Sequence, residues 1–304
     1  MSRPLKLPLW QVAWVRDAVA ARCGLYLGGP HEGYLSAQLA ARMEEMQVNF
    51  ADYARIVQES PAGGGELQTL IERLCIHETG FLRDPSDFQA VASFVLPQLA
   101  REAQRGGRRR LRLVSAGCST GQEAYSLVMM VHEGRVLLEE IEAETVGLDV
   151  SGDAIERAAR GVYPAREVMS LSAWRRERYF RRVGTEYEVI PELRDAVRWL
   201  RWNLTGGLPL TQVDLILCRN VLIYFQEPQR DALVRTLVSA LRLGGFLIAG
   251  YADSLQAYRD ILDSIRVSGA VVFRRVGRPD VAQSRAAAAA PWLSAAAAGN
   301  RGVN

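Results

Sequence analysis

A loop of small residues between a predicted strand and a predicted helix carries the clearest chemistry in this sequence. The apolar run Leu111–Val114 leads into the loop AGCSTG at 116–121, and a helix is expected from Gln122. Small residues at such a turn let a ligand approach the backbone N–H groups closely. The same pattern serves dinucleotides, S-adenosylmethionine or simple tight packing, so the loop alone does not define a ligand.

An acidic residue ends the next predicted strand. Asp149 stands at this tip, where a carboxylate can accept hydrogen bonds from both hydroxyls of a ribose. It could instead belong to the start of the following helix, where Ser151 and Asp153 are candidate caps. The third glycine of a dinucleotide fingerprint is missing, because Ala124 follows Gly121 by three residues. Loop and acid together favour a nucleoside ligand other than NAD.

The sequence gives little support for a metal site or a membrane-spanning segment. The four cysteines are far apart and show no metal-ligand spacing. We therefore expect no metal and a reduced, cytoplasmic protein with buried thiols. No run approaches the ~18 apolar residues of a membrane-spanning helix, so no membrane insertion is expected. The N-terminus also lacks a full signal-peptide pattern.

The elements that would position the loop alternate between strands and helices. Short apolar runs recur from about residue 88, namely LRLVSAG, ETVGLDV, VRWLRWNL, VDLILCRNVLIYF, GGFLIAGY and AVVFRRV. Helical patterns separate most of them, which predicts an α/β fold with a parallel sheet covered on both faces. Alternating residues between the second and third runs predict a small antiparallel β insertion at about 165–200.

The two ends of the chain differ from this middle part in composition and in the spacing of their apolar residues. Residues 1–87 predict an all-α N-terminal domain and linker, since Leu35, Leu39, Met43 and Met46 recur at helical spacing. Residues 88–277 would form the sheet domain. Residues 278–304 are rich in alanine and poor in core-forming residues, which predicts a flexible tail.

Arginines gather in two runs. Residues 101–112 hold six arginines and one glutamate, and a second run spans Arg175 to Arg182. In contrast, residues 1–87 hold eight Lys/Arg against eleven Asp/Glu. Such runs could bind nucleic acid or an acidic protein surface, or form a solvated face. No basic stripe interleaved with aromatic residues accompanies them, so a nucleic-acid partner is not expected.

Four motifs, in order, resemble the chemotaxis receptor methyltransferases, the CheR family. SAGCSTGQEAYSLVMM resembles the glycine loop of that family, and HETGFLRDPSDF at 77–88 resembles its Asn-Glu-Thr-x-Phe-Phe-Arg-Asp/Glu signature. GLDVSGDAIERAARGVYP resembles its ribose segment, and VDLILCRNVLIYF with GGFLIAGYADSL resembles its fourth and fifth strands. The resemblance, over roughly 65–277, implies a Rossmann-like class I methyltransferase sheet with a small antiparallel insertion, preceded by an all-α domain.

The resemblance also implies the cofactor S-adenosyl-L-methionine, the product S-adenosyl-L-homocysteine and a set of site residues. Arg83 would pair with the methionyl carboxylate, and Tyr224 is the implied catalytic position beside the transferred methyl group. Arg83 next to Asp84 would also suit a surface ion pair, Tyr224 plain core and Asn203 a turn. The implied cofactor-binding residues are His77, Thr79, Arg83, Gly117, Glu123, Asp149, Asn203, Leu204, Arg219 and Asn220.

Three places depart from the family pattern. His77 stands where the signature has Asn, although a histidine can still donate a hydrogen bond. Ala124 replaces a proline at the start of a predicted helix. Tyr251-Ala252-Asp253 replaces His-Ser-Glu after the fifth strand, which affects the expectation for substrate handling more than that for cofactor binding.

The implied reaction is methyl transfer to glutamate carboxylates of chemoreceptors, giving methyl esters in chemosensory adaptation. A glutamate carboxylate is already ionised near neutral pH (reference pKa ~4.3), so no general base and no Ser/His/Asp arrangement is required. The expected partner is the cytoplasmic helical bundle of a receptor, bound by a monomer. The arginines of 101–112 would draw this acidic bundle toward the site.

The insertion is short, so no tether to a C-terminal receptor pentapeptide is expected. Two alternatives to receptor methylation remain. One is a methyltransferase of the same fold that acts on a small molecule or a nucleic acid. The other is a CheR-like regulatory module that binds the cofactor but transfers little or nothing, an idea motivated by the departure at Tyr251-Ala252-Asp253.

Overall fold

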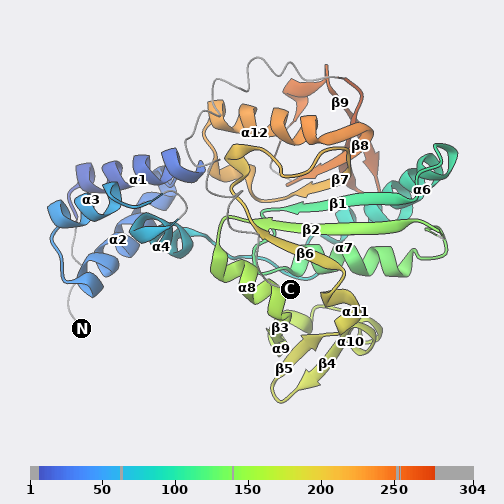
Figure 1. Ribbon diagram of the computed structural model, residues 1–304, viewed down its shortest axis with the longest axis horizontal. Helices are drawn as coiled ribbons and strands as arrows, with labels where there is room; N and C mark the ends of the chain where they lie inside the picture. The colour runs from blue at the N-terminus through green and yellow to red at the C-terminus, as the bar shows by residue number, and fades with distance from the viewer. Residues whose placement is uncertain (1–6, 62–63, 139, 251–252, 254, 278–304) are drawn as a thin grey trace. The chain divides into compact units, whose positions relative to one another are not determined.

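A computed structural model of the chain describes residues 7–61, 64–138, 140–250, 253 and 255–277 (Figure 1). The described residues divide into two compact units. One unit consists of residues 7–76 and 224–232, and the other of residues 77–223 and 233–277. The Ala-rich tail and the departures Tyr251 and Ala252 lie outside the described residues.

The first unit is helical, as the spacing of its apolar residues predicts. Leu35, Leu39, Tyr53 and Leu70 are buried in its core. Asn49 starts the third helix because its side chain accepts a backbone N–H from the first turn. Its described helices are α1 (Leu9–Cys23), η1 (Gly29–His31), α2 (Glu32–Met46), α3 (Phe50–Gln58) and α4 (Gly65–Leu74). The short η4 (Leu222–Tyr224) and α12 (Glu227–Ala240) run from one unit into the other along the chain.

The second unit holds a seven-stranded sheet in the order β6-β2-β1-β7-β8-β10-β9. The first five strands in this order pair in parallel, and β10 pairs antiparallel with β8 and β9. This arrangement confirms the predicted Rossmann-like sheet. Its strands are β1 (Arg110–Ala116), β2 (Glu142–Asp149), β6 (Val197–Arg201), β7 (Val213–Cys218), β8 (Leu241–Ala249), β9 (Leu262–Val267) and β10 (Ala270–Arg275).

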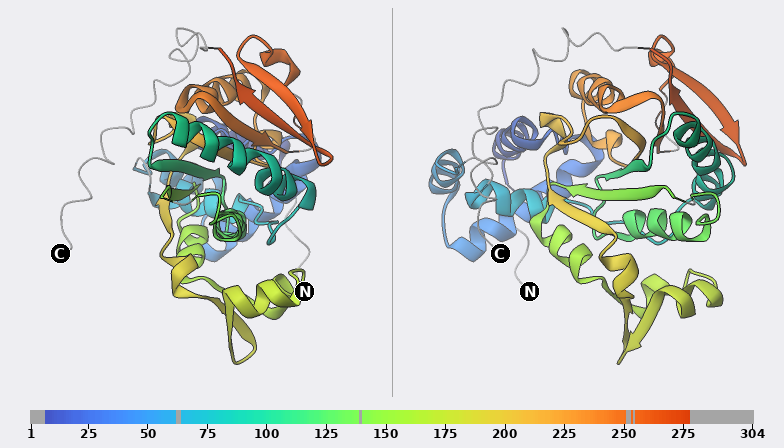
Figure 2. Two further views of the ribbon diagram at one scale, coloured as in Figure 1. Left: turned by 90° about the vertical axis from the view of Figure 1, so that its right-hand side faces the viewer. Right: turned by 45° about the vertical axis from the view of Figure 1, so that its right-hand side comes forward.

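The helices of the second unit connect the strands of the sheet and pack against it. After α5 (Pro85–Ala90), a π-helical turn (η2, Val91–Val95) and α6 (Leu96–Arg105) lead into β1. The helices α7 (Gln122–Glu133) and α8 (Gly152–Arg160) both pack on β2 and β6, which places them along the sheet (Figure 2). Nine consecutive residues of α7, from Gln122 to Met130, are buried, so this helix is enclosed on all sides.

The strand register brings the carboxyl ends of the central strands together. Ala116 of β1 lies opposite Leu148 of β2, and Ser115 lies opposite Leu217 of β7. The loops after β1, β2 and β7 therefore start side by side at one edge of the sheet. Ligands of open α/β sheets bind at this carboxyl edge, where the strand order changes direction.

The predicted antiparallel insertion is present between β2 and β6. Its three-stranded sheet has the order β3-β5-β4. The strands are β3 (Val162–Pro164), β4 (Phe180–Val183) and β5 (Glu186–Val189), and the short helices are α9 (Ala165–Val168), α10 (Ala173–Tyr179) and α11 (Pro191–Arg194). Tyr163 and Tyr179 are buried within it. None of the described helices is long and apolar enough to cross a membrane.

A buried carboxylate joins several elements at the opposite, amino edge of the sheet. Asp214 of β7 is 1% exposed and accepts hydrogen bonds from Arg108 Nη1 and from the backbone N of Arg112, both at 2.8 Å. Arg242 lies 3.6 Å from the same carboxylate. Since Asp214 has fixed partners on both oxygens, removing its charge leaves buried donors without an acceptor.

We predict that Asp214→Asn lowers the free energy of unfolding by about 2–4 kcal/mol, because a buried ion pair loses one partner. Urea denaturation followed by circular dichroism measures this change. Glu142→Gln is the matched control, since it breaks a surface pair with Arg110. It should change the same free energy by less than about 0.5 kcal/mol. Equal effects of both substitutions would contradict the role given to Asp214.

Candidate cofactor site

The loop after β1 folds back on the next strand. The backbone N atoms of Gly117 and Cys118 both donate to the Leu148 carbonyl, at 2.8 and 2.9 Å. Gly117 has φ of 76°, and an added Cβ would lie 2.3 Å from Val221 Cγ2. Glycine is therefore required at this position for both its conformation and its close contact. The loop then leads directly into the N-terminus of α7.

Asp149 fixes the next turn of this loop. Its Oδ2 accepts the Ser119 backbone N–H at 2.8 Å, and its Oδ1 accepts the Ser151 N–H at 3.0 Å. Burial raises the pKa of this carboxyl, while backbone N–H donors, including those of Ser151 and Ser119, act in the opposite direction. The helix cap considered for Asp149 is taken by Ser151, whose side chain accepts the N–H of Ala154. A ligand hydroxyl would therefore have to bind this carboxylate beside the backbone donors that already hold it.

His77 reaches the same loop from the signature segment. Its Nδ1 is within hydrogen-bond distance of Ser119 Oγ, at 3.1 Å. Asp149, Ser119 and His77 thus form a continuous group that joins three segments distant in sequence. Thr79 follows two residues later and is half-buried. The structure therefore brings His77, Gly117 and Asp149 together, while their contacts with a cofactor stay a prediction.

A second group surrounds the guanidinium of Arg219, whose side chain is only 3% exposed. Its Nε lies 2.8 Å from Asp87 and its Nη1 3.3 Å from Glu123. Its Nη2 contacts the Asp84 carboxylate and donates to the Arg83 carbonyl at 2.7 Å. The ring of Phe88 lies on one face, 5.4 Å from the guanidinium carbon. This arginine is thus surrounded by protein groups.

Glu123 is bound on both of its carboxylate oxygens. Oε1 accepts the Ser115 hydroxyl at 2.7 Å, and Oε2 faces Arg219. Burial raises the pKa of Glu123, against the opposing effect of the arginine, and burial likewise raises the pKa of Asp87. One guanidinium therefore faces three carboxylates, and direct cofactor contacts of Glu123 and Arg219 stay a prediction.

Arg83 differs from Arg219 in its surroundings. Its side chain is 34% exposed, and it contacts only Glu78 among the contacts described here, through the carbonyl and the carboxylate at 3.6 Å. The alternative of an ion pair between Arg83 and Asp84 is not what the structure has, because Asp84 pairs with Arg219. The guanidinium of Arg83 thus pairs at the surface with Glu78, and a third of its side chain is exposed to a ligand.

The remaining predicted residues lie at the ends of β6 and β7. The side-chain Oδ1 of Asn203 accepts the Thr205 backbone N–H at 3.0 Å, which fits the turn role considered for it. The preceding residue, Trp202, donates its N–H to the Asp149 carbonyl at 2.7 Å, and Leu204 is buried. Asn220 follows β7 in a left-handed conformation with φ of 57°. The ends of β6 and β7 thus lie at the carboxyl edge that carries the glycine loop.

Tyr224 belongs to the helical unit and not to the sheet unit. Its carbonyl accepts the Tyr26 backbone N–H at 2.8 Å, and its ring lies 6.1 Å from that of His31. The tyrosine is half-buried, so the plain core role considered for it does not hold. Its catalytic role stays a prediction.

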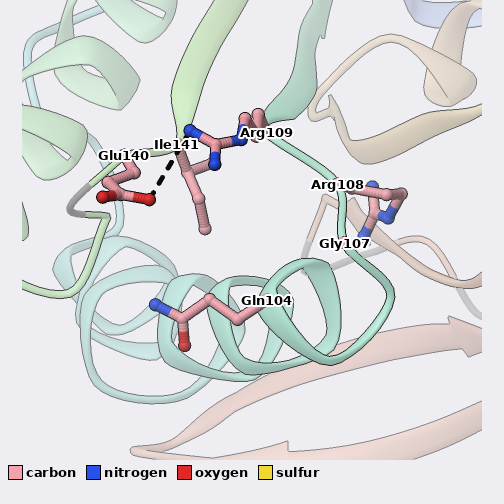
Figure 3. Close-up of a pocket in the computed structure, with 6 residues that line it drawn as sticks. All are labelled: Gln104, Gly107, Arg108, Arg109, Glu140 and Ile141. Atoms are coloured by element: carbon pink, nitrogen blue, oxygen red, sulfur yellow. Dashed lines mark ion pairs between the residues drawn. The ribbon is translucent and has the colours of Figure 1, made fainter.

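The arginine run at 101–112 lies at the amino edge, away from the glycine loop. A cavity of about 440 Å³ opens there, and Arg109 points toward Glu140 across it, with an ion pair of 3.6 Å (Figure 3). Arg108, Arg110 and Arg112 are also paired with carboxylates. Four of the six arginines of this run thus face carboxylates of their own chain, at the edge away from the glycine loop, and the expectation that the run guides a partner to the site stays a prediction.

Two acidic residues of the site were missed in the sequence. Asp84 and Asp87 hold Arg219, although 135 and 132 positions separate them from it. Their spacing with Arg83 and Pro85 resembles an ordinary helix start, with acids in the first turn. The only available signal was the concentration of charge in the signature segment itself, and a single sequence does not pair it with a distant arginine.

The fold and this site define an S-adenosylmethionine-dependent methyltransferase. A family model described as CheR methyltransferase, SAM binding domain, matches residues 77–270. This range covers more than half of the chain and carries all the predicted site residues. The chain belongs to the CheR methyltransferase family, and S-adenosylmethionine is its cofactor.

Individual relatives agree with this family. The chain is 30% identical to chemotaxis protein methyltransferase 2 of Vibrio cholerae, over 81% of this chain and 86% of that protein. It is 32% identical to chemotaxis protein methyltransferase 1 of Pseudomonas aeruginosa, over 83% of this chain and 93% of that protein. A probable biofilm formation methyltransferase, WspC, from the same species is 33% identical over 84% of this chain and 60% of that protein.

The residues present fit this cofactor. A carboxylate at the tip of the second strand, beside a glycine loop and a helix N-terminus, suits a ribose, and Asp149 offers this arrangement. An accessible guanidinium suits a carboxylate, and Arg83 offers it on the signature segment. The side chains present can therefore bind both parts of the cofactor, the nucleoside and the amino acid.

We predict that Gly117→Ala lowers cofactor affinity and costs about 1–3 kcal/mol of stability, since it combines a positive φ with a clash. Calorimetric titration with S-adenosylhomocysteine and thermal unfolding measure the two effects. Val221→Ala removes the Cγ2 atom that an added Cβ would meet. The double variant should therefore recover the steric part but not the conformational part. Full wild-type affinity in Gly117→Ala alone would refute the loop assignment.

Proposed function

We propose that the chain transfers a methyl group from S-adenosylmethionine to glutamate side chains of a chemoreceptor. The observation that carries the proposal is the family match together with relatives named chemotaxis protein methyltransferases. One relative is named for biofilm formation. We therefore define the substrate by its helical cytoplasmic bundle and not by the behaviour that the receptor controls.

The chemistry needs little from the protein beyond binding and alignment. When bound, the cofactor supplies an electrophilic methyl group on its sulfonium. A glutamate carboxylate is ionised near neutral pH, so the chain has no proton to remove from it. Asp149 would hold the ribose hydroxyls and Arg83 the carboxylate of the cofactor. The remaining task is to orient the acceptor carboxylate and strip water from it.

The other site residues divide between these tasks. His77, Thr79, Gly117, Asn203, Leu204 and Asn220 would line the cofactor, and Tyr224 would orient the acceptor. We expect the protein to act as a monomer that docks on the receptor bundle without a C-terminal tether. Of the three carboxylates around Arg219, only Asp84 is substantially exposed, at 50% of its side chain, whereas Asp87 and Glu123 are largely enclosed.

The decisive experiment mixes the full chain with methyl-labelled S-adenosylmethionine and the cytoplasmic fragment of a receptor from the same organism. The proposal expects label on the receptor as a base-labile ester, and its loss when receptor glutamates are changed to alanine. Label that resists base, or that appears on added oligonucleotides, would favour another acceptor. Cofactor binding without transfer to any receptor would favour a regulatory module.

We predict that Arg83→Ala weakens the binding of S-adenosylhomocysteine by about 1.5–3 kcal/mol, the contribution of a hydrogen bond to a charged group. Isothermal titration calorimetry measures it. Glu78→Gln is the matched control, because it removes the protein partner of Arg83 while keeping the guanidinium. It should leave the affinity unchanged or slightly higher. Unchanged affinity in Arg83→Ala would refute the assignment of this residue.

We predict that Tyr224→Phe slows methyl transfer by about tenfold or more while cofactor affinity stays within about twofold of wild type. Steady-state transfer rates and calorimetry separate the two effects. The ring is kept, so its contact with His31 is preserved and the variant tests the hydroxyl alone. A loss of cofactor affinity of the same size would make Tyr224 a binding residue and contradict its catalytic role.

A further inference from the structure

The signature segment contains a turn that is held in a sparsely populated conformation. Leu82 and Asp84 both have left-handed backbone angles, with φ of 51° and 54°. Arg83 lies between them. Side chains other than glycine adopt this conformation at a cost of roughly 1–3 kcal/mol each, so surrounding contacts must hold the turn. Such strain is common where a protein presents a functional group.

One side of this turn is anchored by packing and one hydrogen bond. The ring of Phe81 is buried and meets the rings of Tyr163 and Phe180 edge to face, at 5.0 and 5.1 Å. The Leu82 backbone N donates to Ser126 Oγ of α7 at 2.9 Å. These contacts fix the chain as it enters the turn.

The other side is anchored by Arg219. Its guanidinium donates to the Arg83 carbonyl at 2.7 Å and pairs with the carboxylates that follow at Asp84 and Asp87. Glu123 completes the set from α7. We call these four residues, Arg219, Asp84, Asp87 and Glu123, the Arg219 clamp. Both terminal nitrogens of this guanidinium donate to protein atoms, and its Nε lies at ion-pair distance from Asp87, so the clamp acts on the turn.

We propose that Arg219 is a positioning residue, which with Asp84 and Asp87 holds the strained turn so that the Arg83 guanidinium faces the cofactor. This inference rests on the proposed role of Arg83. It gives Asp84 and Asp87 a function in cofactor binding although neither needs to touch the cofactor. It also changes the role of Arg219, from a cofactor contact to a support for one.

The test compares the same substitution with and without Arg83. Asp87→Asn keeps the shape of the side chain and removes its charge. In the wild-type background it should weaken the binding of S-adenosylhomocysteine about tenfold. In an Arg83→Ala background it should change the dissociation constant by less than about twofold, because the clamp acts through Arg83. Arg219→Gln should follow the same pattern.

Hydrogen exchange without cofactor gives a second readout. In Asp87→Asn, the backbone amides of residues 78–84 should exchange faster than in wild type, while those in the second half of α7 stay protected. Arg175→Gln is the matched control, since it breaks a two-fold pair with Glu133 at the other end of α7. It should leave both the exchange of the turn and the affinity unchanged. Circular dichroism confirms that each variant is folded.

The outcomes separate the two proposals. An equal loss of affinity from Asp87→Asn with and without Arg83, or unchanged exchange of the turn, would overturn the positioning role. Full additivity of Arg219→Gln with Arg83→Ala would make Arg219 a direct cofactor contact. Normal affinity in Arg83→Ala alone would instead reject the role of Arg83 in the proposed function, even where the exchange data still report a clamped turn.

Discussion

The site depends on one buried guanidinium. Arg219 stands at the end of β7 and is the only positive charge among the described contacts of Asp84, Asp87 and Glu123. Enclosing the charges of Arg219, Asp87 and Glu123 is costly, and the raised pKa values of Asp87 and Glu123 reflect that cost. In return, three separate pieces of the chain are joined at one point, namely the signature segment, α7 and the end of β7.

A second carboxylate, that of Asp149, joins segments of the site that Arg219 does not contact. Asp149 binds the glycine loop through Ser119 and the start of α8 through Ser151, and His77 meets the same Ser119. The signature segment is therefore held at both ends, by His77 on the loop and by the Arg219 clamp on β7. A segment with two fixed ends can present the side chains between them, including Thr79 and Arg83, with little loss of entropy on binding.

The sequence predicts the parts of this site that depend on local pattern. The strand before the glycine loop, the acid at the tip of β2 and the antiparallel insertion all follow from periodicity and residue type over short windows. β9 was missed because its six residues, LDSIRV, alternate weakly, and only the pairing with β10 makes it a strand. The partners of Arg219 were missed for a related reason, since ion pairs across more than a hundred residues leave no local pattern.

Local charge counts mislead for the same reason. The run at 101–112 has a large positive excess in the sequence, yet parallel pairing sets Arg110 opposite Glu142 and Arg112 opposite Glu144. Asp214 and Glu140 match Arg108 and Arg109. Exposed charges matched this closely produce little field beyond about a Debye length of ~8–10 Å. Four arginines that look like an uncompensated positive patch in the sequence are therefore matched by carboxylates that the sheet pairing brings beside them.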